Sequence, residues 1–455
     1  MPEPGLPAPS FPVRVPLATR PMGVWQSLAT ARRNLVELIP EIALRQPMVS
    51  GRTGKRWHMV MDPGALRRIL RDALDDYPKS DVTKLILGPA IGQSLFVAEG
   101  SHWHWQRRAA APAFSLRHVQ ALAPVMTAAA EAASQRIASA QGRAADLYQE
   151  MVGATFEVIS DVTFSGGEAF DRAAVHRAIE DYIGTTARVS VLDILGAPGW
   201  VPRPSRLVAG PAMRAMKRLA DHAIETRRAR GPCPVPDLLD HLLAGEDPQT
   251  GRRMDADELR DNLLTFIVAG HETTALALAW SLYLCAGAPE VQEAARAEAQ
   301  AVLGDRAAGA GDVARLVLTR RIVDEALRLY PPAALLSRTA VRRDALCGRE
   351  ILPGDTVMLP IYALHRHHLL WHDPDRFDPA RFADPRAIDR FAYLPFGEGP
   401  RVCIGASFAL QEAVIILSTL LARFRFSPVA GRAPKPVLIL TLRPEGGVWL
   451  QVAPA

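Results

Sequence analysis

The sequence has little cysteine. Its four cysteines lie far apart and match neither a disulfide framework nor a zinc-finger spacing. Such use of cysteine is typical of proteins in a reducing compartment, so we expect no disulfide bonds and a cytoplasmic location. The first residues are rich in proline and contain no apolar stretch of the kind found in signal peptides, so we expect neither a secretory signal nor a membrane anchor.

Long runs of one charge are also absent. The 53 lysines and arginines nearly balance the 48 aspartates and glutamates, and no basic run alternates with aromatic residues. This composition argues against a protein that binds nucleic acid. Internal repeats and low-complexity linkers are missing too, while 49% hydrophobic residues allow a large core. We therefore expect one domain over residues 1–455, with a Pro-rich lead-in at about 1–24, and a monomer.

Helical patterns dominate from Pro63 onward, which predicts a mainly α fold with a small β region. A β-hairpin is predicted from residues 47–49 and 57–61 with a turn at 50–54, and a second sheet region is expected near 357–361. The apolar loop at 196–202 is either a lid or a simple connection between helices.

What the sequence does contain is a glycine-rich segment, F-G-E-G-P-R-V-C-I-G, at residues 396–405. Its glycines and proline exclude a regular helix, so Cys403 should lie at the mouth of the helix that the next residues, 406–424, predict. A helix N-terminus lowers the pKa of a thiol and suits it to ligate a metal. From the residues alone, a plain turn with a buried cysteine remains the alternative. A dinucleotide-binding loop is disfavoured because Val402 stands where a glycine is needed.

A long apolar segment from Glu258 to Ala286 predicts a helix of about 40 Å. It is apolar enough to span a membrane, but Asn262 and the central His271-Glu272 pair would be costly in lipid, so a buried core helix is the better interpretation. The centre reads A-G-H-E-T-T at 269–274. Its Thr273 hydroxyl either bonds back to the preceding helical turn or acts on a ligand.

Two shorter patterns place pairs of side chains on one helix face. Trp103 and Arg107 are separated by four residues, and together they can point N–H groups at one anion, although a surface helix would show the same pair. Glu325 and Arg328 are separated by three residues, as in an ordinary helical ion pair. The histidines at 365, 367, 368 and 372 give no clean ligand set and are expected in a polar loop.

Taken together, these segments resemble the cytochrome P450 family. Residues 396–405 match the heme-binding loop F-G-x-G-x-R-x-C-x-G of that family, and residues 269–274 match its A-G-x-[D/E]-T-T motif. The W-x-x-x-R pattern at 103–107 and the E-x-x-R pattern at 325–328 stand in the order expected of the family. A later P-x-R-F segment supplies Arg381, which the resemblance places in a buried network with the E-x-x-R pair.

The resemblance implies a heme b cofactor (iron protoporphyrin IX) and a role for each matching residue. Cys403 would be the axial ligand of the heme iron, with Phe396 packed on the sulfur side and Gly405 completing the loop. The heme propionates would be bound by Trp103, Arg107, Arg338 and Arg401. Ala269 and Gly270 would let the heme and O2 approach the long helix, while Thr273 holds oxygen or water and Glu272 relays protons.

The activity that this implies is hydroxylation of a lipophilic small molecule with O2. The substrate would be a terpenoid, a steroid or a fatty acid in a pocket lined by Leu95, Phe96, residues 268–269 and residues 333–336. No arginine is identified that must meet a substrate carboxylate inside that pocket, which favours terpenoids and steroids over fatty acids. A peroxygenase, a heme-thiolate isomerase and a non-catalytic heme sensor are the alternatives.

The electrons are expected from a separate protein, because no flavin or iron–sulfur module follows the predicted heme-binding loop. A ferredoxin or flavodoxin with its reductase would fill this role. We expect an acidic partner of this kind to dock near Arg108 and the histidines at 365–368, which would add to a basic surface.

Overall fold

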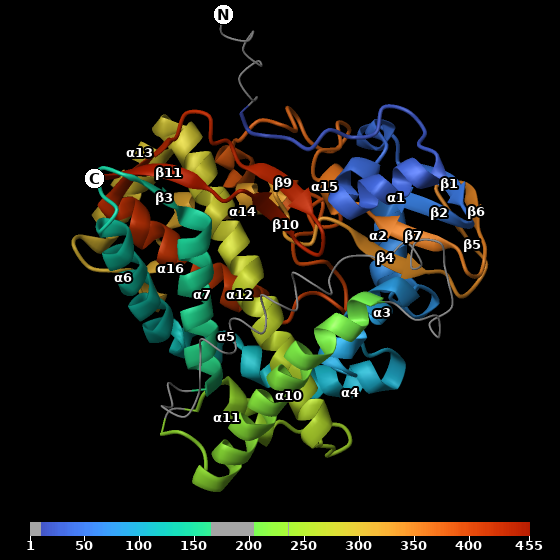
Figure 1. The fold of residues 1–455 in the computed structure, drawn as a ribbon, viewed down its shortest axis with the longest axis horizontal. Coiled ribbons are helices and arrows are strands. Elements are labelled where there is room, and N and C mark those ends of the chain that lie inside the picture. Colours follow the sequence, from blue (N-terminus) through green and yellow to red (C-terminus); the bar gives the residue numbers. More distant parts are fainter. Residues whose placement is uncertain (1–10, 165–203, 235) are drawn as a thin grey trace, which may run out of the picture.

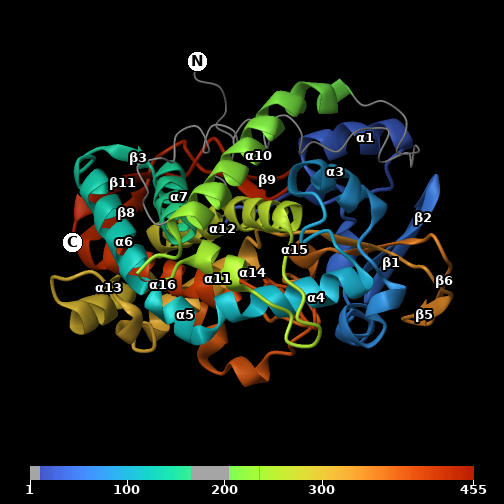
Figure 2. The ribbon, with the colours of Figure 1, turned by 90° about the horizontal axis from the view of Figure 1, so that it is seen from below.

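The computed structural model describes residues 11–164, 204–234 and 236–455. A large helical part lies beside a smaller part that is rich in strands (Figure 1). Figure 2 shows the same two parts from below, with α10 and α4 on opposite sides of α12. This arrangement confirms the mainly α fold with a small β region. The predicted loop at 196–202 falls outside the described residues.

The elements have the following bounds. The α-helices are α1 (Val24–Arg33), α2 (Pro63–Arg67), α3 (Asp81–Ile91), α4 (Gly100–Ala110), α5 (Leu116–Ala121), α6 (Ala123–Ala138), α7 (Leu147–Phe164), α10 (Pro204–Arg230), α11 (Leu238–Ala244), α12 (Ala256–Gly287), α13 (Pro289–Leu303), α14 (Val317–Leu329), α15 (Ile361–Leu364) and α16 (Ala406–Arg423). The strands are β1 (Met48–Thr53), β2 (Lys55–Val60), β3 (Ala144–Asp146), β4 (Leu336–Thr339), β5 (Asp344–Leu346), β6 (Arg349–Ile351), β7 (Thr356–Leu359), β8 (Phe424–Pro428), β9 (Lys435–Leu438), β10 (Leu442–Glu445) and β11 (Trp449–Pro454). Short 3-10 or π turns are η1 (Leu35–Leu38), η2 (Glu41–Leu44), η3 (Arg68–Asp72), η4 (Leu74–Asp76), η5 (Ala111–Phe114), η6 (Ala310–Asp312), η7 (Pro379–Ala383) and η8 (Pro385–Ala387).

Helix α12 passes through the middle of the helical part (Figure 1). It begins at a capping box, in which Asp255 accepts a hydrogen bond from the Glu258 amide and Glu258 accepts one from the Asp255 amide. Helices α12 and α16 are each long and apolar enough to cross a membrane, yet 78% and 72% of their most apolar windows are buried inside the protein. Both are therefore core helices, as predicted for α12.

The predicted hairpin is present, but its turn is shorter than expected. Strands β1 and β2 pair antiparallel from Met48 opposite Val60 to Thr53 opposite Lys55, so the turn is at Gly54, which has a φ of 74°. Gly51 lies inside strand β1, opposite Trp57 of β2. The Trp57 indole covers this position, and a Cβ on residue 51 would overlap the ring. The glycine serves the packing of the tryptophan rather than a turn.

The expected second sheet region belongs to the first sheet. Strand β7 pairs parallel with β2 and antiparallel with β4, which gives one four-stranded sheet in the order β1-β2-β7-β4. The strand expected near 357–361 is therefore present as β7, although it extends the sheet of the hairpin. Pairing between strands about 300 residues apart depends on how the helices between them fold, and the local pattern carries no sign of it.

The region before Cys403 is held by the predicted ion network. Glu325 and Arg328 have no exposed side-chain surface and form two hydrogen bonds of 2.6 and 2.8 Å. Arg328 also donates to the carbonyl oxygens of His365 and Pro374, both at 2.7 Å, and Arg381 joins Glu325 at 3.3 Å. This confirms the predicted grouping of Glu325, Arg328 and Arg381.

We predict that Arg328→Ala destabilises the fold strongly. The change removes the bidentate partner of the buried Glu325 carboxylate and leaves it the longer contact with Arg381, which should lower the free energy of unfolding by about 3–5 kcal/mol. The measurement is urea unfolding followed by circular dichroism. Arg386→Ala is the control, because the Arg386–Asp384 pair is exposed, with 92% of the arginine side chain accessible, and should change stability by less than about 1 kcal/mol. Equal effects of the two changes would contradict the structural role of Arg328.

Candidate functional site

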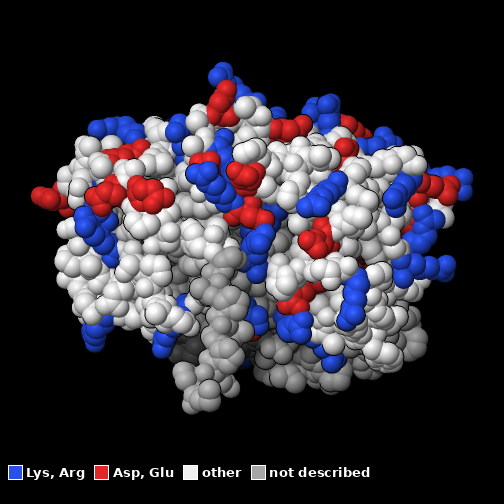
Figure 3. Space-filling model, turned by 90° about the horizontal axis from the view of Figure 1, so that it is seen from above, with Lys and Arg blue, Asp and Glu red and all other residues white. Residues whose placement is uncertain are grey.

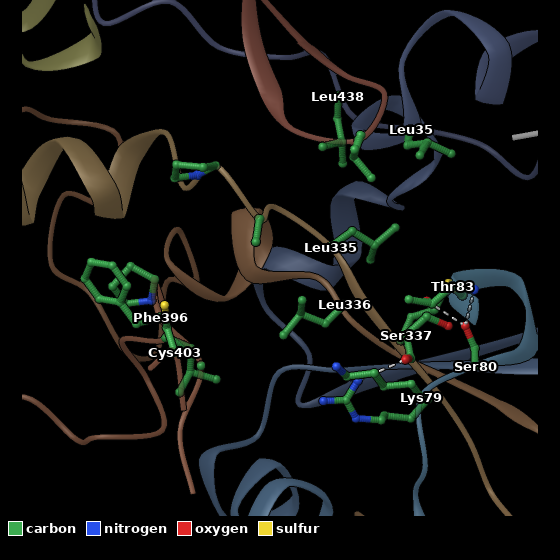
Figure 4. Close-up of a pocket in the computed structure, with 18 of the residues that line it drawn as sticks. Leu35, Lys79, Ser80, Thr83, Leu335, Leu336, Ser337, Phe396, Cys403 and Leu438 are labelled. Carbon is green, nitrogen blue, oxygen red and sulfur yellow. Dashed lines mark hydrogen bonds between the residues drawn. The ribbon is translucent and has the colours of Figure 1, made fainter. Parts of the chain in front are cut away.

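A cavity of about 1770 Å³ lies between the centre of α12, the loop before α16 and the strand-rich part. Cys403 and Phe396 lie on one wall, where Figure 4 shows them next to each other. Ala269, Gly270 and Thr273 of α12 line it as well. The motifs near residues 270 and 400 therefore meet in one space, as the sequence predicts.

The loop before α16 presents the cysteine by turning tightly. The Cys403 amide donates to the Phe396 carbonyl oxygen at 2.8 Å, which closes the loop, and Gly397 and Gly399 have φ values of 71° and 78°. A Cβ on Gly399 would overlap the Leu70 carbonyl oxygen, so this glycine is required by both conformation and space. As a result, the Cys403 side chain is exposed to the cavity.

The pKa of Cys403 differs from the sequence-based expectation. Although the sulfur borders the cavity, the protein atoms around it desolvate the thiol and raise its pKa above the ordinary value, and this outweighs the lowering by a hydrogen bond to the Gly405 backbone and by the Arg107 charge. The start of α16 alone therefore does not produce a thiolate. A bound metal ion would, because a cation that coordinates sulfur displaces the proton.

Basic side chains gather at another wall of the cavity. Lys79, Arg338 and Arg401 line it, and burial lowers the pKa of all three; the charges of Arg401 and Arg338 lower that of Lys79 further. Burial and Arg401 lower the pKa of Arg338 to about 10, and the buried Nε of Arg338 has no hydrogen-bond partner. The acid that faces this group is Glu99, which pairs with Arg401. The group therefore has an excess of positive charge that is partly desolvated.

Trp103 and Arg107 of α4 complete this wall, since both line the cavity. The Trp103 ring lies 4.4 Å from the Arg401 guanidinium, and burial lowers the pKa of Arg107. Desolvated cations beside a cavity favour an anionic ligand. The predicted binding residues therefore fit a cofactor with carboxylate groups, and Lys79 adds a contact that sequence motifs did not reveal. Its nearest sequence signal is the Ser80 N-cap of α3 that follows it.

The centre of α12 divides its polar residues between two faces. The Thr273 hydroxyl lies toward the cavity and donates to the Ala269 carbonyl oxygen at 2.8 Å, so it bonds back to the preceding turn. The side of Gly270 where a Cβ would stand faces Ile159 of α7 at 3.1 Å, so this glycine also permits close packing of two helices. Ala269 is exposed to the cavity.

Glu272 faces away from the cavity. Its carboxylate accepts hydrogen bonds from the Thr441 hydroxyl at 2.9 Å and from Arg443, and it is buried. Consecutive residues of an α-helix point about 100° apart, which separates Glu272 from Thr273 although they are neighbours in sequence. Arg443 and Thr441 were not identified from the sequence, because they follow the E-T-T motif by about 170 residues.

Most of the predicted pocket residues do line the cavity. Leu95, Phe96 and Ala269 line it, and so do three residues of the 333–336 segment, whereas Val268 and Ala334 do not. Further apolar residues come from segments that the sequence did not indicate. These include Leu35, Leu38, Leu85, Ile86, Leu438 and Leu440. Figure 4 shows Leu35, Leu335, Leu336 and Leu438 on one side of the space.

Three of the residues named for the expected basic docking surface, Arg108, His365 and His367, add little positive charge to it. His365 and His367 are buried, and burial lowers the pKa of both, that of His365 to about 3. Both rings are therefore neutral near pH 7. Arg108 is paired with Asp247 through hydrogen bonds of 2.6 and 2.9 Å, which cancels its charge.

The His365 ring holds two segments of the core together instead of adding charge to the surface. Its Nδ1 donates to the Arg328 carbonyl oxygen at 3.1 Å, and its Nε2 accepts from the Leu394 amide at 2.8 Å. His365 therefore joins the end of α14 to the chain that leads into the cysteine loop.

A cavity with a cysteine on a glycine loop, a long helix across it and desolvated cations at its side defines a class of proteins that hold heme through sulfur. The model of the family described as Cytochrome P450 matches residues 25–451. The chain belongs to the cytochrome P450 family.

Individual relatives agree with this assignment. The chain is 32% identical to the cyclooctatin synthase of Streptomyces melanosporofaciens over 92% of its own length and 91% of the relative. It is also 32% identical to the cyclooctat-9-en-7-ol 5-monooxygenase of that organism, over 92% and 90%. Among solved structures, the cytochrome P450DA heme domain has a TM-score of 0.79 at 29% identity and covers 90% of both chains. Heme-dependent monooxygenation is thus the chemistry of the family.

We predict that Arg338→Met speeds the loss of bound heme without destabilising the apoprotein. The change removes one charged donor near the cofactor, which should raise the rate of heme transfer to apomyoglobin about 10-fold. The apoprotein should gain stability, because an unpaired buried charge disappears. Arg342→Met is the control, since that side chain is 77% exposed. A wild-type rate of heme loss would show that Arg338 does not bind the cofactor.

We also predict a pH dependence that originates at His365. Below the ordinary histidine pKa of 6.5 the unfolded chain binds a proton at this residue, whereas the folded ring stays neutral down to about pH 3. Stability should therefore fall as the pH is lowered from 6.5 toward 3. In His365→Gln, which is less stable at pH 7, urea midpoints should depend less on pH across this window. His372→Gln, at a site with 90% exposure, should keep the wild-type slope, and an equally unchanged slope in His365→Gln would refute the assignment.

Proposed function

We propose that this protein hydroxylates a neutral lipophilic small molecule of the terpenoid or steroid class. It would use O2, a heme b cofactor and electrons from a separate ferredoxin or flavodoxin with its reductase. The observation that carries the proposal is the shared cavity of Cys403 and Thr273, whose other walls are mostly apolar. We further propose that it acts in the cytoplasm as a monomer.

The binding residues have separate tasks in this proposal. The Cys403 sulfur would ligate the heme iron, and Phe396 would pack beside it. Arg338, Arg107 and Trp103 would bind the propionates together with Lys79. Arg401 already pairs with Glu99, so it would hold the shape of this wall as well as contribute charge. When bound, the heme supplies the activation of O2 and the oxidation of the C–H bond.

Thr273 would control a proton beside the reacting atoms. Because its hydroxyl hydrogen is given to the Ala269 carbonyl oxygen, the Thr273 oxygen can accept a hydrogen bond from a donor in the cavity. Glu272 would supply protons from the far face of α12. Its carboxylate is held there by Thr441 and by Arg443, whose side chain is 28% exposed.

The substrate class follows from the apolar lining, which selects by shape and buried area at about 25 cal/mol per Å². The two Streptomyces relatives support it through their names, which refer to cyclooctatin and cyclooctat-9-en-7-ol.

One observation favours a second candidate. Arg45 and Arg52 line the cavity, and neither has an ion-pair partner among the described residues. Both side chains offer a cation to a carboxylate in the cavity, so a long-chain carboxylic acid is the alternative substrate.

One face of the molecule shows no strong preference for a charged partner. On the face drawn in Figure 3, acidic and basic side chains are interspersed. A docking site for a ferredoxin or flavodoxin would therefore depend on local complementarity rather than on a field of one sign.

The experiment that tests the function is turnover with NAD(P)H, a ferredoxin and its reductase. Ferric protein is first titrated with terpenoids, steroids, long-chain acids and the matching alcohols, and ligands that change the heme spin state are offered as substrates. We expect alcohols and polycyclic lipophiles to be hydroxylated, and a response to the acids alone would select the second candidate. Cys403→Ser should lose the red-shifted Soret band of the reduced CO complex, whereas Cys347→Ser should keep it. Retention of that band in folded Cys403→Ser would refute the ligand assignment.

We predict that Thr273→Ala binds heme normally but wastes electrons. Product formed per NAD(P)H should fall by roughly ten-fold, less than the full effect of a general acid, because water partly replaces the hydroxyl. Peroxide should account for the missing electrons. Thr273→Ser keeps the hydroxyl and should restore most of the coupling. Wild-type coupling in Thr273→Ala would remove this residue from proton delivery.

A further inference from the structure

Three buried tyrosine hydroxyls hold the segment Phe11–Leu17 against the helical core. The Val13 amide donates to the Tyr283 hydroxyl at 3.1 Å, and the Tyr330 hydroxyl donates to the Val13 carbonyl oxygen at 2.8 Å. The Val15 amide donates to the Tyr362 hydroxyl at 3.0 Å. The tyrosines come from α12, the end of α14 and α15, so one segment is fixed to three core elements.

Side chains of the same segment add to this attachment. Val13 and Val15 are buried, and the Phe11 ring packs on Gly287, where a Cβ would overlap it. Arg14 forms an ion pair of 2.5 Å with Asp375. This described part of the Pro-rich lead-in is therefore a packed element. Figure 1 shows it in blue, running from the helical part across to α1.

The residues that follow directly line the cavity. All of Ala18–Met22 do so, and the Glu41 amide at the start of η2 donates to the Ala18 carbonyl oxygen at 2.9 Å. The Ala18 amide donates to the Ile39 carbonyl oxygen at 3.0 Å, and the Met22 sulfur accepts from the Thr30 hydroxyl at 3.7 Å. Met22 is half-buried, so its thioether has a defined position in the wall.

The family match begins at residue 25, after this segment. The segment therefore lies outside the residues that the family model matches.

We propose that Ala18–Met22 is a substrate-binding wall and that the tyrosine-held segment Phe11–Leu17 keeps it in place. A fixed wall loses no conformational entropy when a ligand packs on it, so it can select among ligands by length. Short ligands that remain near Cys403 do not touch it, whereas long ones end against Met22. The inference rests on the proposed function in one respect, namely that the heme is bound through Cys403.

The test uses imidazoles with butyl and dodecyl tails, because an imidazole nitrogen ligates ferric heme iron whatever the natural substrate is. In wild-type holoprotein the dodecyl compound should bind more tightly, as measured by the shift of the Soret band. In Met22→Asp the affinity of dodecylimidazole relative to butylimidazole should fall about 10-fold, because the dodecyl tail would desolvate the aspartate charge in the wall. Binding of butylimidazole itself should stay unchanged. Trp25→Asp is the matched control, since Trp25 is 82% exposed and does not line the cavity.

Hydrogen exchange in the holoprotein gives a second measurement. Dodecylimidazole, but not butylimidazole, should slow exchange of the amides in 11–22. Tyr362→Phe leaves the Val15 amide without its acceptor, so exchange there should become faster and part of the dodecyl gain should be lost.

An equal dodecyl gain in wild type, Met22→Asp and Trp25→Asp would overturn the proposal, as would the absence of any gain in wild type. Failure of the proposed function would appear differently. It would show as missing heme absorbance before any ligand is added, or as missing turnover while the imidazoles still bind.

Discussion

A buried guanidinium group needs hydrogen-bond acceptors for its N–H groups. The acceptors that the Arg328 guanidinium binds determine the position of the loop that carries Cys403. These acceptors are the Glu325 carboxylate and the carbonyl oxygens of His365 and Pro374. The His365 ring in turn accepts a hydrogen bond from the amide of Leu394, which lies two residues before the cysteine loop begins. A helix, a turn and the loop are thereby fixed to one buried charge. Because breaking a buried ion pair costs several kcal/mol, the loop has little freedom to move.

The cavity shows the opposite use of charge. At Arg338 and Lys79 the fold leaves cations partly desolvated, with Glu99 as the facing acid. These desolvated cations destabilise the folded protein when no ligand is bound, and an anionic ligand offsets this destabilisation. Likewise, Cys403 has a raised thiol pKa until a metal ion coordinates it. Cofactor binding is therefore part of the electrostatic balance of the fold, whereas the Glu325–Arg328 pair is balanced without it.

The cavity has two ends with different origins. Near Cys403 it is built from family motifs, and the sequence identified most of these residues. At the other end it is built from Ala18–Met22, η2 and the β1–β2 hairpin, none of which carries a motif. If chemistry belongs to the first end and selection of the ligand to the second, members of one family can share a reaction and differ in substrate. The basic residues Arg45 and Arg52 lie at that second end.

The sequence by itself determined the fold class, the reactive loop and the motif residues, because each depends on local geometry. A glycine loop before a helix exposes Cys403, and residues three or four apart share a helix face. It did not determine where side chains point across the fold. The neighbours Glu272 and Thr273 separate because they lie on different faces of α12, and what each face meets depends on distant segments. Similarly, Gly51 looks like a turn residue until Trp57 is placed over it, and His365 looks like a surface residue until Arg328 and Leu394 surround it. Burial and pairing arise from contacts between remote parts of the chain, so only the tertiary structure decided them.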